Sequence, residues 1–275
     1  MNDSNRNNNP EDNGLYGTFK ELYENKAMEI TLVGMYEKPF NHVYANVGGY
    51  YRGEAEFYLR HIREHGEKVL ELASGDGRRF LIPLLKHGMQ ADGVEISTDM
   101  LELCREKLEK LPEEQQSRAR LFNEDVYGFT SDSKYDAVIL PATSICLFSE
   151  TEDGISRLFG KVKEAMADKG VFIFDFRTGP EVGSETVPHK IMIKTENDRM
   201  PVVYQEFPGS PDGWNTVNFY TEWQGRKYMA SSRKKLFTGD EIKKTLEAEG
   251  FEIIDSLRYS GGAMNIELLA AVLKG

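Results

Sequence analysis

One short segment constrains the fold of this chain more than any other, because an apolar run leads into a Gly-x-Gly turn and a second apolar run. Residues 69–73 (Val-Leu-Glu-Leu-Ala) have the composition of a buried parallel strand. Gly75 and Gly77 follow, and residues 80–85 predict the start of a helix. Glycine lets the backbone approach a ligand closely, and the helix points its free N–H groups at the same place. The segment therefore predicts a strand–turn–helix unit that binds a ligand at the turn.

Acidic residues near this turn narrow the class of ligand. Glu71 lies in the predicted strand, which gives the pattern Glu-x-x-x-Gly-x-Gly, and Glu95 ends the next apolar run. An acid at the tip of the second strand can accept hydrogen bonds from both hydroxyls of a ribose. A dinucleotide-binding fingerprint would require Gly or Ala where this chain has Phe80. These features predict a nucleoside ligand at the carboxyl ends of a parallel sheet and disfavour a nicotinamide dinucleotide.

In this ordered set of motifs, the chain resembles the class I S-adenosylmethionine-dependent methyltransferases of the small-molecule and natural-product type. The resemblance covers roughly residues 54–169. It implies an α/β fold with a Rossmann-like seven-stranded sheet, mostly parallel with one antiparallel strand, and S-adenosyl-L-methionine as cofactor. The turn departs from the family's common Gly-x-Gly-Thr-Gly form, because it carries Asp76 and then Arg78 and Arg79. These residues change the local charge and keep the turn.

The resemblance also assigns cofactor contacts. Arg52 would bind the methionine carboxylate, and its alternative is a surface position. Ile96 and Met100 would pack on the adenine ring, although Met100 suits a plain core position equally well. Asp125 would meet the exocyclic amine of adenine beside the main-chain N–H of Val126, and its alternative is a cap or turn residue. The full expected set is Tyr44, Arg52, Glu71, Ala73, Gly75, Gly77, Glu95, Ile96, Met100, Asp125, Val126 and Pro141.

Contacts to the methyl acceptor are expected from two parts of the chain. Apolar spacing predicts a helix over residues 15–35. The resemblance implies that this helix contributes to a lid over the pocket, and the alternative is that it simply packs on the core. The segment after the fourth strand begins Pro-Ala-Thr-Ser, which lacks the motif of enzymes that methylate amino groups of nucleic acids. The expected acceptor-binding residues are Tyr16, Phe19, Tyr23, Thr143, Ser144, Phe148 and Arg177.

The sequence leaves the catalytic group open. Methyl transfer from a sulfonium depends mainly on in-line orientation, and an amine acceptor need only be bound in its neutral form. The candidates for a general base are His42, Asp175 and His189, each of which is more often a surface or strand-end residue. No spacing of His, Cys or acidic residues predicts a metal site.

Changes in the pattern of apolar and polar residues along the chain predict five segments. Residues 181–237 alternate between apolar and polar positions with turns between them, which predicts an antiparallel meander. The resemblance implies that this meander serves as a lid or a dimer contact. The expected division is a disordered tail (1–14), an N-terminal helical lid (15–53), a cofactor-binding α/β core (54–180), the β insertion (181–237), and a C-terminal completion of the core sheet (238–275).

Composition limits the partners. The net charge of −11 argues against nucleic acid, because phosphate contacts require clustered Lys and Arg. No window has the about 20 consecutive apolar residues of a membrane span, and the N-terminus has no signal-peptide pattern. The two cysteines predict no disulfide framework. We therefore expect a cytoplasmic protein with a small-molecule or short-peptide acceptor, no nucleic acid or membrane partner, and a possible homodimer.

Together these observations predict an N- or O-methyltransferase that acts on a small molecule or short modified peptide, in a biosynthetic pathway. Two alternatives stay open at this point. One is a nicotinamide-dependent oxidoreductase, and the other is a non-catalytic S-adenosylmethionine-binding sensor or interaction protein on the same fold.

Overall fold

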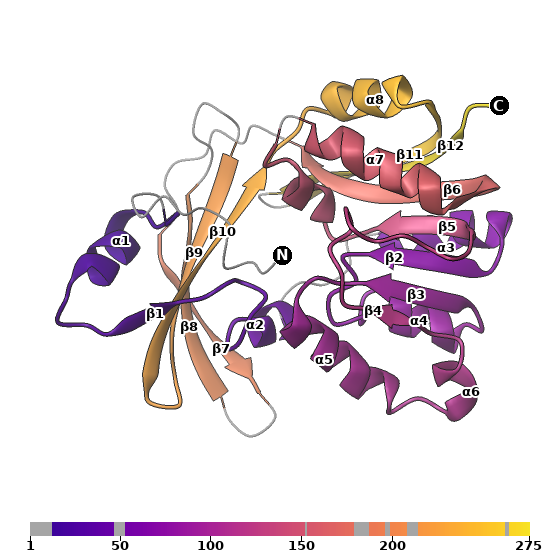
Figure 1. The fold of residues 1–275 in the computed structure, drawn as a ribbon. Helices are drawn as coiled ribbons and strands as arrows, with labels where there is room; N and C mark the ends of the chain where they lie inside the picture. Colours follow the sequence, from indigo (N-terminus) through magenta and orange to yellow (C-terminus); the bar gives the residue numbers. More distant parts are fainter. Residues whose placement is uncertain are drawn as a thin grey trace. The chain divides into compact units, whose positions relative to one another are not determined.

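The computed structural model describes residues 13–46, 53–151, 153–178, 187–195, 199–207, 214–261 and 264–275. The chain divides into two compact units, one within Met1–Gly48 and Pro180–Lys235 and the other within Gly49–Gly179 and Leu236–Gly275. Each unit is built on its own β-sheet (Figure 1). Segments far apart in the sequence therefore share one core in each unit.

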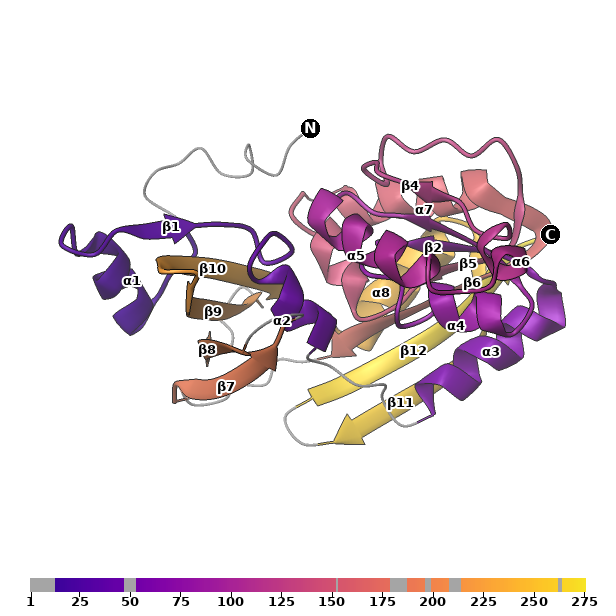
Figure 2. The same ribbon diagram turned by 90° about the horizontal axis from the view of Figure 1, so that it is seen from below.

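The larger unit contains a seven-stranded sheet with the order β11-β12-β6-β5-β2-β3-β4. The five strands from β2 to β6 run parallel, and β12 runs antiparallel to both β6 and β11. Figure 2 shows β11 and β12 side by side. The predicted seven-stranded, mostly parallel sheet with one antiparallel strand is confirmed. The bounds are β2 (Lys68–Leu72), β3 (Gln90–Val94), β4 (Leu121–Phe122), β5 (Tyr135–Leu140), β6 (Met166–Thr178), β11 (Phe251–Gly261) and β12 (Met264–Leu273).

Helices cover both faces of this sheet because alternate side chains along each strand point to opposite sides. Apolar residues of α3 and α4 pack on the face that includes Val69 and Ile173. Those of α7 and α8 pack on the face that includes Leu70 and Phe172. The bounds are α3 (Glu54–His65), α4 (Leu81–Lys86), α5 (Thr98–Leu108), α6 (Glu113–Gln116), η2 (Ser144–Phe148), α7 (Gly154–Ala165) and α8 (Gly239–Ala248). Among the helices described, none is long and apolar enough to cross a membrane.

The sequence predicts a helix cap at Ser97 and a capping box formed by Thr238 and Glu241, and both form in the structure. The Ser97 hydroxyl accepts a hydrogen bond from the main-chain N–H of Met100 at the start of α5. Thr238 and Glu241 form a complete capping box at the start of α8. Such caps satisfy N–H groups that have no partner within the helix.

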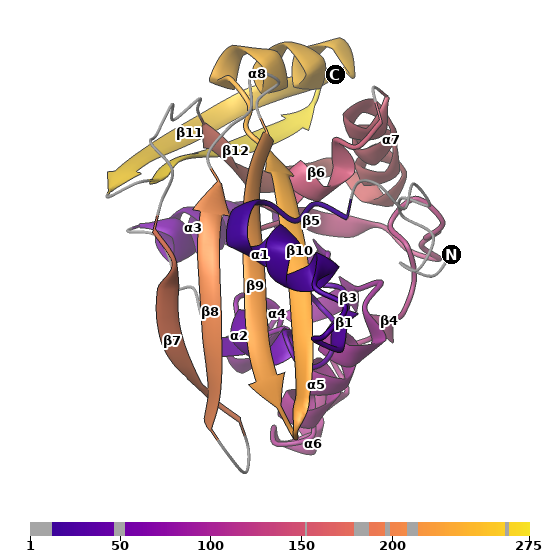
Figure 3. The same ribbon diagram turned by 90° about the vertical axis from the view of Figure 1, so that its left-hand side faces the viewer.

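The smaller unit contains a five-stranded sheet with the order β1-β10-β9-β8-β7. Strands β7 to β10 form the predicted antiparallel meander, and α1 lies against one face of it (Figure 3). The core on the other face includes Phe40 and Val43. The bounds are α1 (Gly17–Glu24), β1 (Ile30–Leu32), α2 (Asn41–Asn46), β7 (His189–Lys194), β8 (Arg199–Phe207), β9 (Trp214–Trp223) and β10 (Arg226–Lys235).

Two predicted elements are shorter in the structure. The helix expected over residues 15–35 ends at Glu24, and Ile30–Leu32 instead pairs in parallel with β10. Ile30 and Thr31 are β-branched and favour a strand where a sheet edge is available. The pairing with β10 therefore overrides the helical spacing of the sequence. Residues 121–127 begin with an apolar pair and contain an acid near their end, so they predict the third core strand. The strand comprises only the two residues of β4, because the chain then enters a turn.

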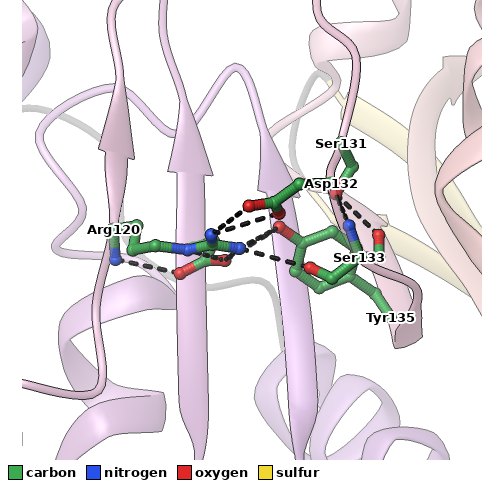
Figure 4. A network of polar contacts seen from close by, with 6 residues as sticks. Arg120, Ser131, Asp132, Ser133 and Tyr135 are labelled. Carbon is green, nitrogen blue, oxygen red and sulfur yellow. Dashed lines mark hydrogen bonds and ion pairs between the residues drawn. The ribbon is translucent and has the colours of Figure 1, made fainter.

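A polar network links β3, β4 and β5 of the larger sheet near the amino-terminal ends of β4 and β5 (Figure 4). Arg120 Nη2 lies 2.8 Å from the Asp92 carboxylate, and its Nη1 lies 3.1 Å from the Asp132 carboxylate. The Tyr135 hydroxyl also donates to Asp92, at 2.8 Å. Asp92 is buried, so these partners replace the water that its charge would otherwise require.

Candidate cofactor and acceptor site

The Gly-x-Gly turn leaves the carboxyl end of β2 in a left-handed conformation. Ala73, Gly75 and Gly77 have φ angles of 50°, 56° and 69°. A Cβ atom on Gly77 would stand 2.6 Å from the Sγ atom of Cys104 on α5, which is less than van der Waals contact. Both the backbone conformation and the neighbouring helix therefore require glycine at position 77.

Glu71 supports this turn from inside the sheet. Its Oε2 atom accepts a hydrogen bond from the main-chain N–H of Leu81, at 2.8 Å, where α4 begins. Burial raises the pKa of Glu71 well above its ordinary value, although the Leu81 hydrogen bond acts in the opposite direction. Glu71 therefore joins β2 to the helix that follows the turn. A direct contact between Glu71 and the cofactor stays a prediction.

Glu95, at the end of β3, holds the turn from the other side. Its Oε2 atom accepts from the main-chain N–H of Gly75 and its Oε1 atom from that of Ser97, each at 2.8 Å. Each oxygen of a carboxylate can accept two hydrogen bonds. This anchored carboxylate therefore has the chemistry to accept from the two hydroxyls of a ribose.

The residues expected around the adenine follow β3 and β4. Met100 is fully buried on α5, Ile96 is half-buried, and Val126 is buried in the core of the sheet. Asp125 accepts a hydrogen bond from the main-chain N–H of Tyr127, at 2.9 Å, as a turn residue does. The contacts of all four residues with adenine stay predictions.

The chain after β5 forms the next edge of the site. Ala142 and Thr143 have φ angles of 64° and 57°, which are unusual for residues other than glycine. The Ser144 hydroxyl donates to the carbonyl of Pro141, at 2.6 Å, and the Phe148 ring stands edge-on to Tyr127. Thr143 and Ser144 are almost fully buried. Their expected contacts with the acceptor, like that of Phe148, are untested.

A buried charged cluster lies at the same edge, beside β6. Asp175 accepts hydrogen bonds from the Tyr58 hydroxyl and from the main-chain N–H of Thr143, both at 2.9 Å. Arg79 binds Glu54 through two hydrogen bonds of 2.9 and 2.7 Å. Burial and the negative charge of Glu54 raise the pKa of Asp175 to about 7, while Arg79 and the two hydrogen bonds lower it.

Of the residues in this cluster, only Asp175 is predicted as a site residue from the sequence. Glu54 and Tyr58 stand four residues apart on α3 and are fully buried, so they share the face that packs on the sheet. An acidic residue on the apolar face of a predicted helix was the available signal for this cluster. The Arg79 partner carries no such signal, because its position depends on the turn.

Most of the other predicted residues belong to the smaller unit. Phe19 is buried in the core of the smaller unit, Tyr16 is exposed beside Phe207, and Tyr44 stands edge-on to Tyr36. Tyr23 and His42 are half-buried, and His189 stacks on Tyr204. Arg177 is half-buried near the end of β6, and Arg52 lies outside the described residues. The ligand roles of these residues stay predictions.

These observations agree with a nucleoside cofactor at the carboxyl edge of the larger sheet. Because positions 75 and 77 have no Cβ atoms, a ligand can lie close to the backbone of the turn. Glu95 presents an anchored carboxylate at the same place. The buried hydroxyl of Ser74 has no hydrogen-bond partner within the described part of the chain. Across the same residues, no cluster of three or more His, Cys, Asp or Glu could hold a metal ion.

Residues 69–170 match a family model described as a methyltransferase domain. This segment is similar to a methyltransferase domain. The matched segment begins in β2 and ends in β6, so it includes the Gly-x-Gly turn, Glu95 and the segment after β5. The predicted resemblance to class I methyltransferases is thereby confirmed, and the nicotinamide-dependent alternative loses its support.

Several solved structures share the fold of this chain. The glycopeptide N-methyltransferase MtfA, complexed with S-adenosyl-L-methionine, has a TM-score of 0.60 and 22% identity over 89% of this chain and 92% of its own. CcbJ from Streptomyces caelestis has a TM-score of 0.69 and 17% identity over 88% and 99% of the two chains. The sugar N-methyltransferase KedS8 from a Streptoalloteichus species has a TM-score of 0.68 and 19% identity over 86% and 94%. No curated protein gave a significant match.

Proposed function

We propose that this protein transfers a methyl group from S-adenosyl-L-methionine to a nitrogen atom of a small molecule or short modified peptide, in a biosynthetic pathway. The observation that carries the proposal is Glu95, whose carboxylate is anchored by Gly75 and Ser97 at the tip of the second parallel strand. The methyltransferase domain match and the S-adenosyl-L-methionine complex of MtfA support the choice of cofactor.

The residues of the larger unit have distinct roles in this proposal. Glu95 binds the ribose hydroxyls, and Gly75 and Gly77 let the backbone lie close to the cofactor. The half-buried Asp125 and Ile96 suit the adenine end, as the sequence predicts. When bound, S-adenosyl-L-methionine supplies an activated methyl group on a sulfonium. The protein contributes orientation, which can provide about 7–11 kcal/mol of the required acceleration.

Nitrogen is the proposed acceptor atom for two reasons. An amine needs only to be bound neutral, whereas a hydroxyl requires a base near it. Asp175 is fully buried with both oxygens hydrogen-bonded, so it is poorly placed to remove a proton from a ligand. The printed names of MtfA and KedS8 also specify N-methylation, of a glycopeptide and a sugar. Oxygen stays the alternative target.

Calorimetric titration with S-adenosylhomocysteine tests the cofactor site. We expect Glu95→Gln to weaken binding by about tenfold or more, because hydrogen bonds to a charged group contribute about 1.5–3 kcal/mol. Gly75→Val should also weaken binding, because a β-branched residue is strained at the φ of 56°. Glu106→Gln, an exposed carboxylate on α5, is the matched control and should bind normally.

Unchanged affinity in both Glu95→Gln and Gly75→Val would refute the site. NAD⁺ in the same cell should produce no heat of binding. Methyl-labelled S-adenosylmethionine offered with a panel of amines and matching alcohols then tests the acceptor atom. Label transfer to the alcohols alone would refute nitrogen as the target, and cofactor binding without transfer to any acceptor would favour a sensor.

A further inference from the structure

The backbone after β5 adopts a conformation that its residues rarely take. Ala142 and Thr143 are consecutive left-handed residues, and threonine is β-branched. Such a conformation persists only where surrounding groups hold it, and it is concentrated at functional sites. The turn lies at the carboxyl end of a parallel strand, where open α/β sheets bind their ligands.

Asp175 is the group that holds this turn. Its Oδ2 atom accepts the main-chain N–H of Thr143, at 2.9 Å, and its Oδ1 atom accepts the Tyr58 hydroxyl, at 2.9 Å. Asp175 and Tyr58 are both fully buried. Asp175 lies on β6 and Tyr58 on α3, and these two elements pack together. The Tyr58 hydroxyl therefore fixes the Oδ1 atom of Asp175, and the Oδ2 atom is directed at the turn.

We propose that Asp175, oriented by Tyr58, is a positioning residue that sets the Pro141–Ser144 turn for cofactor binding. This inference rests on the proposed function, because it assumes that the turn borders the S-adenosylmethionine site. In this role Asp175 holds the backbone, whereas the sequence predicts it as one candidate for the general base. A carboxylate whose two oxygens both accept hydrogen bonds inside the core is suited to hold backbone.

The charges around Asp175 make this hold sensitive to protonation. Glu54 and Tyr58 on α3 and Arg79 in the turn after β2 face it, and Arg177 lies two residues along the same face of β6. Burial and Glu54 raise the pKa of Asp175 to about 7. Burial and the charge of Asp175 raise the pKa of Tyr58 well above its ordinary value, so Tyr58 remains a donor.

Protonation weakens the hold at either oxygen. A proton on Oδ2 competes with the N–H of Thr143. A proton on Oδ1 leaves a neutral carboxyl group, whose Oδ2 atom accepts that N–H less strongly than a carboxylate oxygen does. The turn is therefore held best by the ionised carboxylate. Affinity for the cofactor should then increase as the pH rises through about 7.

The NMR signal of the Thr143 amide reports on its hydrogen bond to Asp175 without any ligand. In protein labelled with ¹⁵N-threonine, its resonance is assigned by comparison with Thr143→Ser. We expect its proton shift to follow one titration near pH 7 in the wild type and no such titration in Asp175→Asn. A Thr143 amide that does not titrate in the wild type overturns the proposal.

Calorimetry with S-adenosylhomocysteine tests the consequence. We expect wild-type affinity to improve by roughly fivefold between about pH 6 and about pH 8, and Asp175→Asn to bind more weakly with no such dependence. Tyr58→Phe keeps the carboxylate and removes its donor, and it serves if Asp175→Asn does not fold. Its affinity should also fall, whereas Glu106→Gln should keep the wild-type profile.

The outcomes separate this inference from the proposed function. Equal affinity and the same pH profile in the wild type, Asp175→Asn and Tyr58→Phe would overturn the positioning role and leave the cofactor site intact. Failure of the wild type to bind S-adenosylhomocysteine at any pH would overturn both. A residue that only stabilised the fold would change the unfolding temperature and leave the pH dependence of binding unchanged.

Discussion

At the scale of single residues, the Gly-x-Gly turn combines two separate demands on glycine. Gly77 has a φ of 69°, which disfavours any side chain, and it also faces the sulfur of Cys104 at close range. Gly250, which follows α8 in the same unit, has a φ of 87° and no atom within 4 Å of the position of a Cβ. The pair therefore separates the cost of the conformation from the cost of the contact.

We expect Gly250→Ala to lower the free energy of unfolding by about 1 kcal/mol, through backbone strain alone. Gly77→Ala should cost at least about 1 kcal/mol more, because its Cβ also overlaps Cys104. Hydrogen exchange of amides in the larger sheet measures both. In a Cys104→Ala background the excess should shrink, since the sulfur is gone. Equal costs at the two glycines would show that the turn relaxes away from α5.

At the scale of elements, the larger sheet is joined by charges as well as by main-chain hydrogen bonds. Asp92 lies in β3, Tyr135 begins β5, and Arg120 immediately precedes β4. Arg120 also holds the pKa of Asp132 below its ordinary value through a hydrogen bond and its charge. The network therefore connects three strands through one partly exposed guanidinium.

We expect Arg120→Met to destabilise the larger unit by about 1–3 kcal/mol, because Asp92 stays buried after its partner is removed. Arg118→Met is the matched control, since Arg118 pairs with the exposed Glu114. Surface pairs of this kind contribute about 0–1 kcal/mol. Urea unfolding of both variants, followed by exchange of β3 and β5 amides, makes the comparison. Equal losses would mean that Asp92 gains solvent when Arg120 is absent.

At the scale of the whole molecule, two compact units make a single unfolding temperature an incomplete description. Both tryptophans, Trp214 and Trp223, lie in β9 of the smaller unit. Tryptophan fluorescence therefore reports on that unit, and amide exchange in β5 and β6 reports on the other. The pH dependence of stability should be measured separately for each.

The larger unit should lose stability as the pH rises from about 5.5 to about 8. Burial raises the pKa of Asp175 to about 7 and that of Glu71 well above its ordinary value, so the folded state binds protons that the unfolded state has released. The stability that these two carboxyl groups contribute is fully present below their pKa values in the unfolded state. It is lost as the pH rises through their pKa values in the folded state. The loss should be on the order of 2 kcal/mol.

Asp175→Asn should reduce this slope, because one of the two buried carboxylates is removed. The carboxylates whose pKa is lowered, Asp132, Glu249 and Asp255, lose their contributions only in more acid solution and do not affect this range. A variant slope equal to that of the wild type would contradict the prediction. The same ionisation that holds the turn after β5 would thus cost stability, which is common at functional sites.

The sequence by itself determined the class of the larger unit. Its strand–glycine–helix pattern, the acid that ends the second strand and the continuous apolar runs of the buried strands are local features. Local backbone preferences are sufficient to produce them. The capping box at Thr238 and the alternating meander follow the same rule. Each of these predictions depended on residues within a few positions of one another.

Only the tertiary structure decided which groups meet. Tyr58 and Asp175 are 117 residues apart, and their hydrogen bond exists because α3 packs on one face of β6. The parallel pairing of Ile30–Leu32 with β10 likewise needed a sheet edge supplied from far along the chain. Such contacts form because the whole core must bury its apolar side chains and give each buried polar group a hydrogen-bond partner. No local sequence pattern contains this information.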